Sequence, residues 1–156
     1  EHPVDVGDAR ILVFGMGRTG TAAYDWLAET GEKVLGLEMD NYRVASQRAA
    51  GRNVALADAE NVNLWRGLRL DGVAGVVLAM DDIEAKTIAA RALRRRGFKG
   101  PIVAHALYEE HIDQMREAGA THTYLTMYQA GMGLAEHTAR AMDLDLAARG
   151  TPRTAP

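Results

Sequence analysis

The feature that most constrains the fold is a glycine-rich turn near the N-terminus. The apolar run at residues 10–14 is followed at once by Gly15-Met16-Gly17-Arg18-Thr19-Gly20, and a helical pattern opens from this turn. A strand, a G-x-G-x-x-G loop and a helix in this order are typical of a site for a dinucleotide pyrophosphate. The first glycine permits the tight turn, the second admits the phosphates, and the third lets the helix pack on the strand. The alternative is that the glycines serve the turn alone.

Short apolar runs and longer helical patterns alternate along the rest of the chain. We expect strands at residues 10–14, 34–37, 53–57, 73–79, 101–104 and 123–125. We expect helices at residues 19–30, 41–50, 81–96, 109–118 and 130–148. In the first helix we expect a buried stripe of Ala22, Ala23, Trp26 and Leu27, and Asp81 is expected to cap the third helix with Glu84 as its capping-box partner.

Continuous apolar strands are typical of a parallel sheet that is covered on both faces. The sequence therefore predicts an α/β fold: a Rossmann-like, doubly wound parallel sheet in three layers, α/β/α, forming a single domain. We place this domain at residues 9–149, between a flexible N-terminal segment, 1–8, and a flexible tail, 150–156.

Composition excludes several classes of function. The 156 residues carry a net charge of −3 and no cysteine. No basic surplus is available to neutralise phosphates, so we expect no nucleic-acid partner. Thiolate catalysis and cysteine metal sites are excluded. The longest apolar stretch, residues 73–80, is too short to span a bilayer, and no leader-like segment opens the chain, so we expect a cytoplasmic location.

An acidic residue follows the second expected strand. Glu38 lies about 20 residues beyond the glycine loop, where the fingerprint places a carboxylate that accepts ribose hydroxyls. Asp40 is the alternative, although it can instead cap the next helix. A carboxylate here favours NAD or AMP-type ligands over NADP. Arg43 complicates this, because it is either a solvated helix residue or a partner for a 2′-phosphate.

Two later strand ends complete the expected crevice. Asp58, with Ala59, follows the third strand, where it can accept the exocyclic amine of adenine or cap a short helix around residues 60–64. Ala79 and Met80 follow the fourth strand and are expected to form an apolar wall over the base and ribose. Met80 as ordinary core filling is the alternative.

The remaining titratable residues do not form a convincing catalytic set. The five histidines show no metal-ligand spacing, and no nucleophile elbow or Walker lysine occurs. His105, at the end of the fifth strand, is the one position where an acid or base could be argued. We therefore expect no enzyme, no catalytic residue and no metal.

Several segments resemble a known family, the regulator-of-potassium-conductance domain, also called the RCK, TrkA-N or KTN domain. The resemblance rests on residues 11–20, Glu38-Met39-Asp40, Asp58-Ala59 and residues 78–82, and it covers about residues 9 to 140. Residues 51–54 and 128–133 are most similar to the version attached to Kef-type potassium/proton antiporters. The sequence departs from the family's pattern at two places. The usual Gly-Asp-Ala-Thr is here Ala57-Asp58-Ala59-Glu60, and an arginine common after the fifth strand is replaced around His105.

The resemblance implies a nucleotide-sensing regulatory domain rather than an enzyme. It implies binding of NAD(H) or AMP/ADP/ATP, a homodimer, and control of a membrane-embedded potassium or other monovalent-cation transporter or channel domain. The alternative is a fragment of an NAD-dependent oxidoreductase, which would need a substrate-binding part and a proton-transfer group. A second alternative is a redox-sensing repressor, which would need a helix-turn-helix and a basic surface, and the sequence indicates neither.

The final expected helix predicts where a dimer would form. Met132, Ala135, Ala139 and Met142 recur at helical spacing, beyond the point where the sheet needs further cover. Such a stripe either covers one face of the sheet in a monomer or becomes buried against a second chain.

Overall fold

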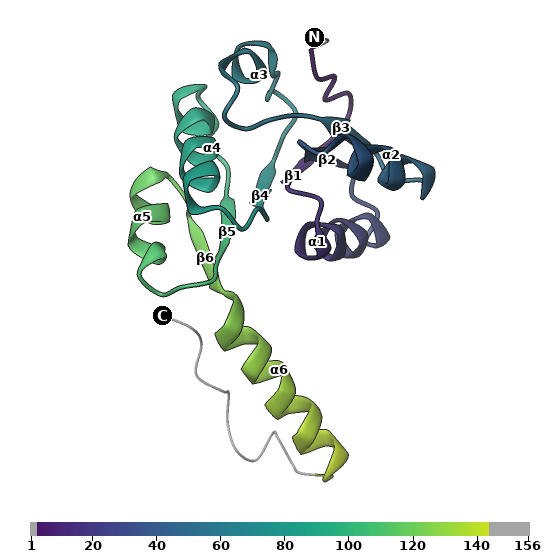
Figure 1. Ribbon diagram of the computed structural model, residues 1–156, viewed down its shortest axis with the longest axis vertical. Helices are drawn as coiled ribbons and strands as arrows, with labels where there is room; N and C mark the ends of the chain where they lie inside the picture. The colour runs from purple at the N-terminus through teal and green to yellow at the C-terminus, as the bar shows by residue number, and fades with distance from the viewer. Residues whose placement is uncertain (1–2, 144–156) are drawn as a thin grey trace.

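The computed structural model describes residues 3–143, and its centre is a six-stranded parallel sheet (Figure 1). The strands are β1 (Ile11–Phe14), β2 (Val34–Glu38), β3 (Val54–Leu56), β4 (Gly75–Leu78), β5 (Ile102–Ala106) and β6 (His122–Leu125). Their order across the sheet is β3-β2-β1-β4-β5-β6. The order reverses between β1 and β4, which is where a doubly wound sheet opens a ligand crevice. This confirms the predicted Rossmann-like fold.

Helices lie on both faces of the sheet. Within the described residues they are α1 (Arg18–Glu29), α2 (Asn41–Ala49), α3 (Val62–Gly67), α4 (Ile83–Arg95), α5 (His111–Ala118) and α6 (Thr126–Ala141). Side chains of α1 and α2 join the core on one face, whereas side chains of α3, α4 and α5 join the core on the other. Figure 1 shows α1 and α2 on the opposite side of the sheet from α4 and α5. The result is the expected three-layer arrangement.

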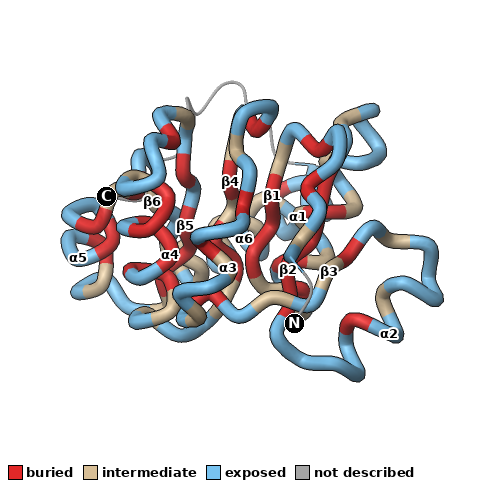
Figure 2. The backbone as a smooth tube through the Cα atoms, turned by 90° about the horizontal axis from the view of Figure 1, so that it is seen from above, coloured by how far each residue is buried: buried red, intermediate tan, exposed pale blue. Residues whose placement is uncertain are grey.

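The larger core lies beneath α3, α4 and α5. Leu12 and Phe14 of β1 point into it, as alternate residues of a strand do. The ring of Trp65 on α3 stacks on Phe14 with centroids 5.5 Å apart. The indole N–H of Trp65 donates to the carbonyl of Ala59 over 2.7 Å, so the buried ring keeps its polar atom satisfied. The central strands are accordingly buried along most of their length (Figure 2).

Among the described residues, the opposite face is covered over β1, β2 and β3 and partly over β4. Val13, Val77 and Val103 lie in one row across β1, β4 and β5, and they pass from fully buried through half-buried to 37% exposed. Tyr124 on β6 is 46% exposed. Helix α6 follows β6 but extends away from the sheet (Figure 1). Within the described residues, no helix therefore covers this face at β5 and β6.

Helix α1 buries a different stripe from the one expected. Tyr24 is buried, whereas Trp26 is 67% exposed and Ala22 is also exposed. The hydroxyl of Tyr24 accepts a hydrogen bond of 2.7 Å from the N–H of Asn53, which satisfies the polar end of the buried ring. The prediction for Trp26 and Ala22 was wrong because the buried stripe runs through residues 20, 24 and 27 instead.

The expected cap of the helix after β4 was also wrong by one residue. Asp82, not Asp81, is the N-cap of α4, and its Oδ1 accepts the N–H of Glu84 over 3.1 Å. Because Asp82 takes the cap, Asp81 lies in the turn before the helix, and its side chain is exposed.

The ends of the chain differ from expectation in two ways. Helix α6 begins at Thr126, four residues earlier than expected, because β6 runs into it without a loop. Ala139 of the expected stripe is buried, but Ala135 and Met142 are exposed, and the expected helix end at Ala148 lies outside the described residues. At the other end, Val6 is buried and Val4 packs on the same core, so these two residues of the expected flexible segment contact the domain. The expected tail, 150–156, also lies outside the described residues.

Candidate functional site

A pocket of about 600 Å³ opens where the strand order reverses, at the carboxyl ends of β1, β2, β3 and β4. Of the residues predicted to bind a nucleotide, it is lined by Gly15, Gly17, Arg18, Thr19, Glu38, Met39, Asp58, Ala59, Ala79 and Met80. Met16 and Gly20 do not line it. The pocket is also lined by Arg43, which the sequence had indicated as one of two alternatives, and by seven residues that were not predicted to bind: Phe14, Leu37, Ala57, Glu60, Asp81, Asp82 and Ala85. The four strand ends were the usable signal, because parallel strands bring them to one edge.

Two glycines of the loop are required by close contacts. Gly15 has a φ of +89°, and a Cβ there would lie 2.8 Å from the backbone nitrogen of Met80. A Cβ on Gly20 would lie 1.6 Å from the carbonyl oxygen of Gly15, so Gly20 lets α1 pack on the turn. A Cβ on Gly17 meets nothing within 4 Å and would point into open space. Gly15 and Gly20 therefore shape the turn, whereas Gly17 leaves room beside it.

The start of α1 leaves backbone donors for a ligand. Gly17 is the N-cap of this 12-residue helix, and no side chain caps the helix there. The first N–H groups of a helix have no partner within it, and they carry part of the positive end of the helix dipole. Gly17, Arg18 and Thr19 all line the pocket. An anionic group is therefore favoured at this point.

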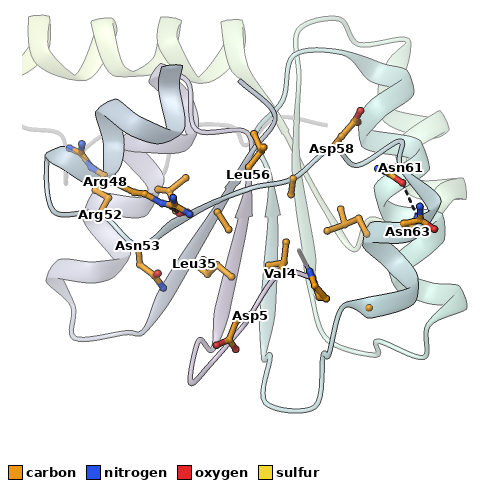
Figure 3. Close-up of a pocket in the computed structure, with 16 residues that line it drawn as sticks. Val4, Asp5, Leu35, Arg48, Arg52, Asn53, Leu56, Asp58, Asn61 and Asn63 are labelled. Carbon is orange, nitrogen blue, oxygen red and sulfur yellow. Dashed lines mark hydrogen bonds between the residues drawn. The ribbon is translucent and has the colours of Figure 1, made fainter. Parts of the chain in front are cut away.

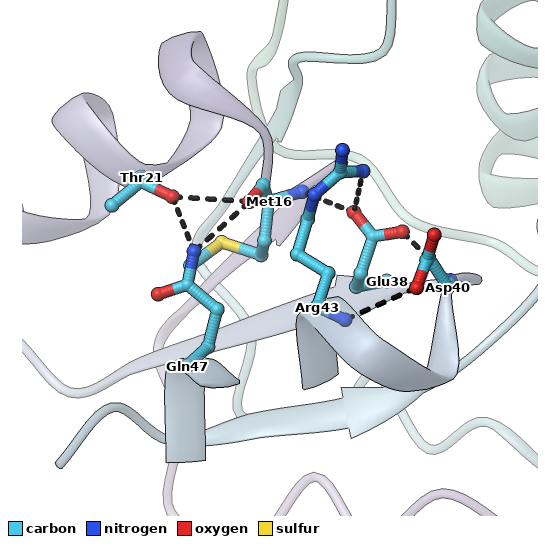
Figure 4. Close-up of polar contacts among 6 residues, drawn as sticks. All are labelled: Met16, Thr21, Glu38, Asp40, Arg43 and Gln47. Carbon is cyan, nitrogen blue, oxygen red and sulfur yellow. Dashed lines mark hydrogen bonds and ion pairs between the residues drawn. The ribbon is translucent and has the colours of Figure 1, made fainter. Parts of the chain in front are cut away.

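Glu38 is held in place by backbone donors from two segments (Figure 4). It is only 3% exposed. Its Oε1 accepts the N–H of Met16 over 2.9 Å, and its Oε2 accepts the N–H of Asp40 over 2.8 Å. The guanidinium of Arg43 lies 3.3 Å from Oε1. The carboxylate thus connects the glycine loop to the end of β2 and still faces the pocket.

The structure separates the roles of the two acids considered after β2. Asp40 is the N-cap of α2, and its Oδ1 accepts the N–H of Arg43 over 3.1 Å. Asp40 does not line the pocket, whereas Glu38 does. Asp40 therefore caps α2, and Glu38 is the acid that lies in the wall of the pocket.

A glutamine fixes the loop from its other side. The side-chain amide of Gln47 on α2 donates to the carbonyl of Met16 over 3.0 Å and to the hydroxyl of Thr21 over 2.7 Å. Thr21 donates in turn to the carbonyl of Met16 over 3.1 Å. Met16 is fully buried, so its role in this structure is to anchor the loop.

The adenine-side candidates lie between β3 and α3. Asp58 lines the pocket, and its Oδ1 accepts the N–H of Glu60 over 2.9 Å. Asn61, not Asp58, is the N-cap of α3. Asp58 therefore closes the turn before the helix and does not cap it, and it keeps a second oxygen for another donor.

The opposite wall comes from the turn after β4. Ala79 is buried, and Met80 both lines the pocket and packs against the larger core, so the two roles considered for Met80 coexist. Asp81 and Asp82 add negative charge to this wall.

A buried polar cluster lies behind this wall. Lys86 of α4 is buried, and its ammonium donates to the carbonyl of His105 over 2.6 Å. Nδ1 of His105 lies 2.9 Å from the hydroxyl of Thr126, the first residue of α6. Nε2 has no hydrogen-bond partner among the described residues, and it lies 3.7 Å from an oxygen of Asp81.

Burial shifts the pKa values of this cluster. Desolvation lowers the pKa of Lys86, although Asp81 and Asp82 oppose the shift. Desolvation, and after it the ammonium of Lys86, lower the pKa of His105 below its usual range. A signal for Lys86 was present in the sequence, because it occupies a position of the apolar stripe that continues through Ala89, Ala90 and Leu93.

A larger pocket of about 960 Å³ lies beside the edge strand β3 (Figure 3). Its arginines are already engaged: Nε of Arg48 donates to the carbonyl of Val54 over 2.7 Å, and Arg52 forms two bonds with Asp25. This pocket lies away from the reversal between β1 and β4. Position rather than size therefore identifies the smaller pocket as the candidate site.

Within the described residues, no three histidine, aspartate or glutamate side chains are grouped so that they could hold a metal ion. No described helix is long and apolar enough to cross a membrane.

The fold and the pocket define a class: a Rossmann-like domain with a ligand crevice at its topological switch point. The TrkA-N domain model matches residues 11–126, and the chain belongs to this family. The predicted relation to RCK domains of Kef-type antiporters is confirmed by the relatives. The chain is 27% identical over 127 residues to KefB of Alkalimonas amylolytica, which carries the name of a K(+) efflux antiporter. This match covers 81% of the chain but 19% of that relative.

A second relative is similar to this chain in sequence, and two solved structures are similar to it in fold. The glutathione-regulated potassium-efflux system protein KefC of Cronobacter sakazakii is 26% identical over 74% of the chain, which spans 19% of that protein. The TrkA-N domain of the Escherichia coli inner membrane protein ybaL has a TM-score of 0.74 at 20% identity, with 85% of this chain and 98% of that chain covered. The AMP-bound Kef CTD of Shewanella denitrificans has a TM-score of 0.69 at 17% identity, with 85% and 80% covered. These structures share the fold.

Proposed function

We propose that this chain is a nucleotide-sensing regulatory domain of a potassium or other monovalent-cation transporter. It binds an adenine nucleotide, NAD(H) or AMP, ADP or ATP, at the cytoplasmic face of the membrane. The observation that carries the proposal is the arrangement of Glu38 beside the glycine loop at the switch point. There a phosphate meets the start of α1, and ribose hydroxyls meet a carboxylate held by two backbone donors. The AMP bound in the Kef relative supports the ligand class.

The same pocket supports binding rather than catalysis. Among the described residues its lining contains no serine, histidine, tyrosine or lysine, and its titratable side chains are carboxylates and two arginines. His105 lies behind the wall with its ring buried. A search for NADH consumption by absorbance, with a panel of carbonyl substrates, tests the oxidoreductase alternative. We expect no turnover.

Ligand binding itself is tested by calorimetry and thermal denaturation with NAD, NADH, AMP, ADP and ATP. We expect micromolar binding of at least one. Ligand at about 100 times its dissociation constant then stabilises the fold by about 2.7 kcal/mol. If none binds at millimolar concentration, the proposal fails.

Gly17→Val supplies the specific control. A valine side chain would occupy the space beside the loop, so we expect binding to be lost. The fold remains intact because the Cβ meets no neighbour. Gly72→Val is the matched variant: its Cβ also meets nothing within 4 Å, and Gly72 does not line the pocket, so it keeps full affinity.

We propose further that the domain works as a homodimer through α6. This helix exposes Met127 and Leu134, and the sheet face at Val103 and Tyr124 is uncovered. Apolar surface on a projecting helix and on a bare sheet face is buried if two copies exchange contacts around a twofold axis. Thr126 starts this helix and contacts His105, whose Nε2 lies 3.7 Å from Asp81 in the wall of the pocket. Occupancy of the pocket and the position of α6 are thus connected through two contacts.

A further inference from the structure

Arg43 occupies the boundary between two neighbouring spaces. It belongs to the first turn of α2, and its side chain is about half exposed. It lines the nucleotide pocket together with Gly17 and Arg18. The same three residues line an open hollow of about 540 Å³ on the outer side of the glycine loop, completed by Met16, Thr21, Ala22, Asp25 and Gln47. We call this space the outer hollow.

Arg43 is the exchangeable partner of Glu38. The two backbone N–H groups that bind Glu38 belong to the fixed loop and to the start of α2, so the carboxylate cannot turn away from the pocket. The contact from Arg43 is longer, at 3.3 Å, and it comes from a flexible, solvated side chain. The guanidinium end of this pair is about half exposed, whereas Glu38 is buried and keeps its two backbone donors, so Arg43 is the partner that can move.

The charges around the outer hollow make it the positive edge of the site. Asp25 is neutralised by Arg52 through bonds of 2.7 and 2.8 Å, which lower the pKa of Asp25. Glu38 is similarly balanced by Arg43. Arg18 has no ion pair within the described part of the chain and remains as an uncompensated positive charge. The far walls of the pocket, by contrast, are acidic and are lined by Asp58, Glu60, Asp81 and Asp82.

We propose that Arg43 sets the tolerance of this site for a phosphate on the ribose 2′-oxygen. When the 2′-position carries a hydroxyl, Glu38 accepts it. When the position carries a phosphate, Arg43 leaves Glu38 and pairs with the phosphate in the outer hollow, with Arg18 alongside. Glu38 repels the 2′-phosphate and Arg43 attracts it, so the two residues change the affinity for a 2′-phosphorylated ligand in opposite directions. This inference rests on the proposed nucleotide site and names the class of ligand it accepts.

The test compares AMP with adenosine 2′,5′-bisphosphate by isothermal calorimetry at one ionic strength. Both ligands carry the 5′-phosphate, so the ratio of their dissociation constants isolates the effect of the 2′-phosphate. For the wild type we expect the ratio to lie within about tenfold of unity. Arg43→Gln should weaken the bisphosphate relative to AMP by about a further tenfold, as expected for loss of one charge-assisted hydrogen bond. Arg43→Lys should restore part of the loss.

Arg91→Gln is the matched control, because it removes the same charge from an exposed position of α4 outside both spaces. It should leave the ratio unchanged within twofold. If Arg43→Gln also leaves the ratio unchanged while AMP still binds, this inference is wrong and the proposed function stands. If the wild type binds neither ligand at millimolar concentration, the proposed function and this inference fail together.

Discussion

The two halves of the sheet differ in how completely the chain covers them. Around β1, β2 and β3, one face packs on α1 and α2 and the other carries the larger core, and Met16 of the glycine loop is bonded to Glu38 and Gln47. Around β5 and β6, α4 and α5 cover one face, while Val103 and Tyr124 remain exposed on the other. The half that holds the candidate ligand site, β1 to β3, is covered on both faces, and we call it the closed half. The half at β5 and β6, which leads to α6, has one uncovered face, and we call it the open half.

This difference fits the division of work that the proposed regulatory function requires. A binding site keeps its affinity when its supports are rigid, whereas a surface that changes partners must stay accessible. The cluster of Lys86, His105 and Thr126 lies at the seam between the halves. Substitutions in the closed half should therefore change the stability of the fold, those in the open half the association of two chains, and those at the seam the pH dependence of stability.

The largest effect is expected in the closed half, from Gly20→Ala. The added Cβ would overlap the carbonyl of Gly15, so either α1 or the turn must move. We expect the free energy of unfolding to fall by about 3 kcal/mol. Urea denaturation followed by circular dichroism measures this, with Gly72→Ala, an unobstructed position, as the control. A loss below about 1 kcal/mol would show that the loop is not rigid.

The next effect is expected on the open half, from Leu134→Glu. Leu134 is 72% exposed on α6, so the charge should not disturb the fold of one chain. In a dimer built on α6, a buried glutamate would raise the dissociation constant by about 100-fold. Light scattering behind a sizing column gives the mass of each form. A wild type that is monomeric at tens of micromolar, with and without nucleotide, would rule out the dimer.

A smaller effect is expected at the seam, as a dependence of stability on pH. The folded state lowers the pKa of His105, so below a pH of about 6.5 the unfolded chain binds a proton more readily than the folded chain. Stability is then present above that pH and is lost as the pH falls, by at most about 1.4 kcal/mol per pH unit. Asp81 and the main chain at Ala79 and Met80 oppose the shift.

His105→Gln removes this titration and keeps a polar group beside Thr126. Denaturation at pH 8, 7, 6 and 5.5 should give a flatter profile for the variant than for the wild type. His122→Gln, an exposed histidine, serves as the comparison and should keep the slope. Parallel profiles for all three proteins would contradict the assignment.

The smallest effect is expected from Asp25→Asn, within the closed half but at its surface. Asp25 is 42% exposed, so its pair with Arg52 contributes less than about 1 kcal/mol. Arg52 lowers the pKa of Asp25, so the contribution is present at neutral pH and is lost as the pH falls below 3.8. Thermal denaturation at pH 7 and pH 3 should show the difference between wild type and variant shrinking at the lower pH.

Much of the closed half could be predicted, because local sequence determines it. The apolar strands, the glycine turn and the acid after β2 each depend on near neighbours. Trp26 was misplaced because an apolar side chain on a helix does not reveal whether it faces the sheet or solvent. Tyr24 is the buried aromatic residue instead, because its hydroxyl accepts a hydrogen bond from Asn53, 29 residues away. The cluster of Lys86 and His105 was missed for the same reason, since it joins α4, β5 and α6 only after folding.

The bonds from Glu38 and Gln47 to Met16 have a kinetic consequence. They position the glycine loop on β2 and α2 before any ligand arrives, so binding requires little ordering of that segment. The entropy lost on association is then mostly that of the ligand, and the on-rate approaches the value set by diffusion and orientation. A ligand that finds one side of its crevice already rigid can displace only the other side. Under the proposed function, we therefore expect the displacement on binding to fall on the turn after β4 and not on the glycine loop.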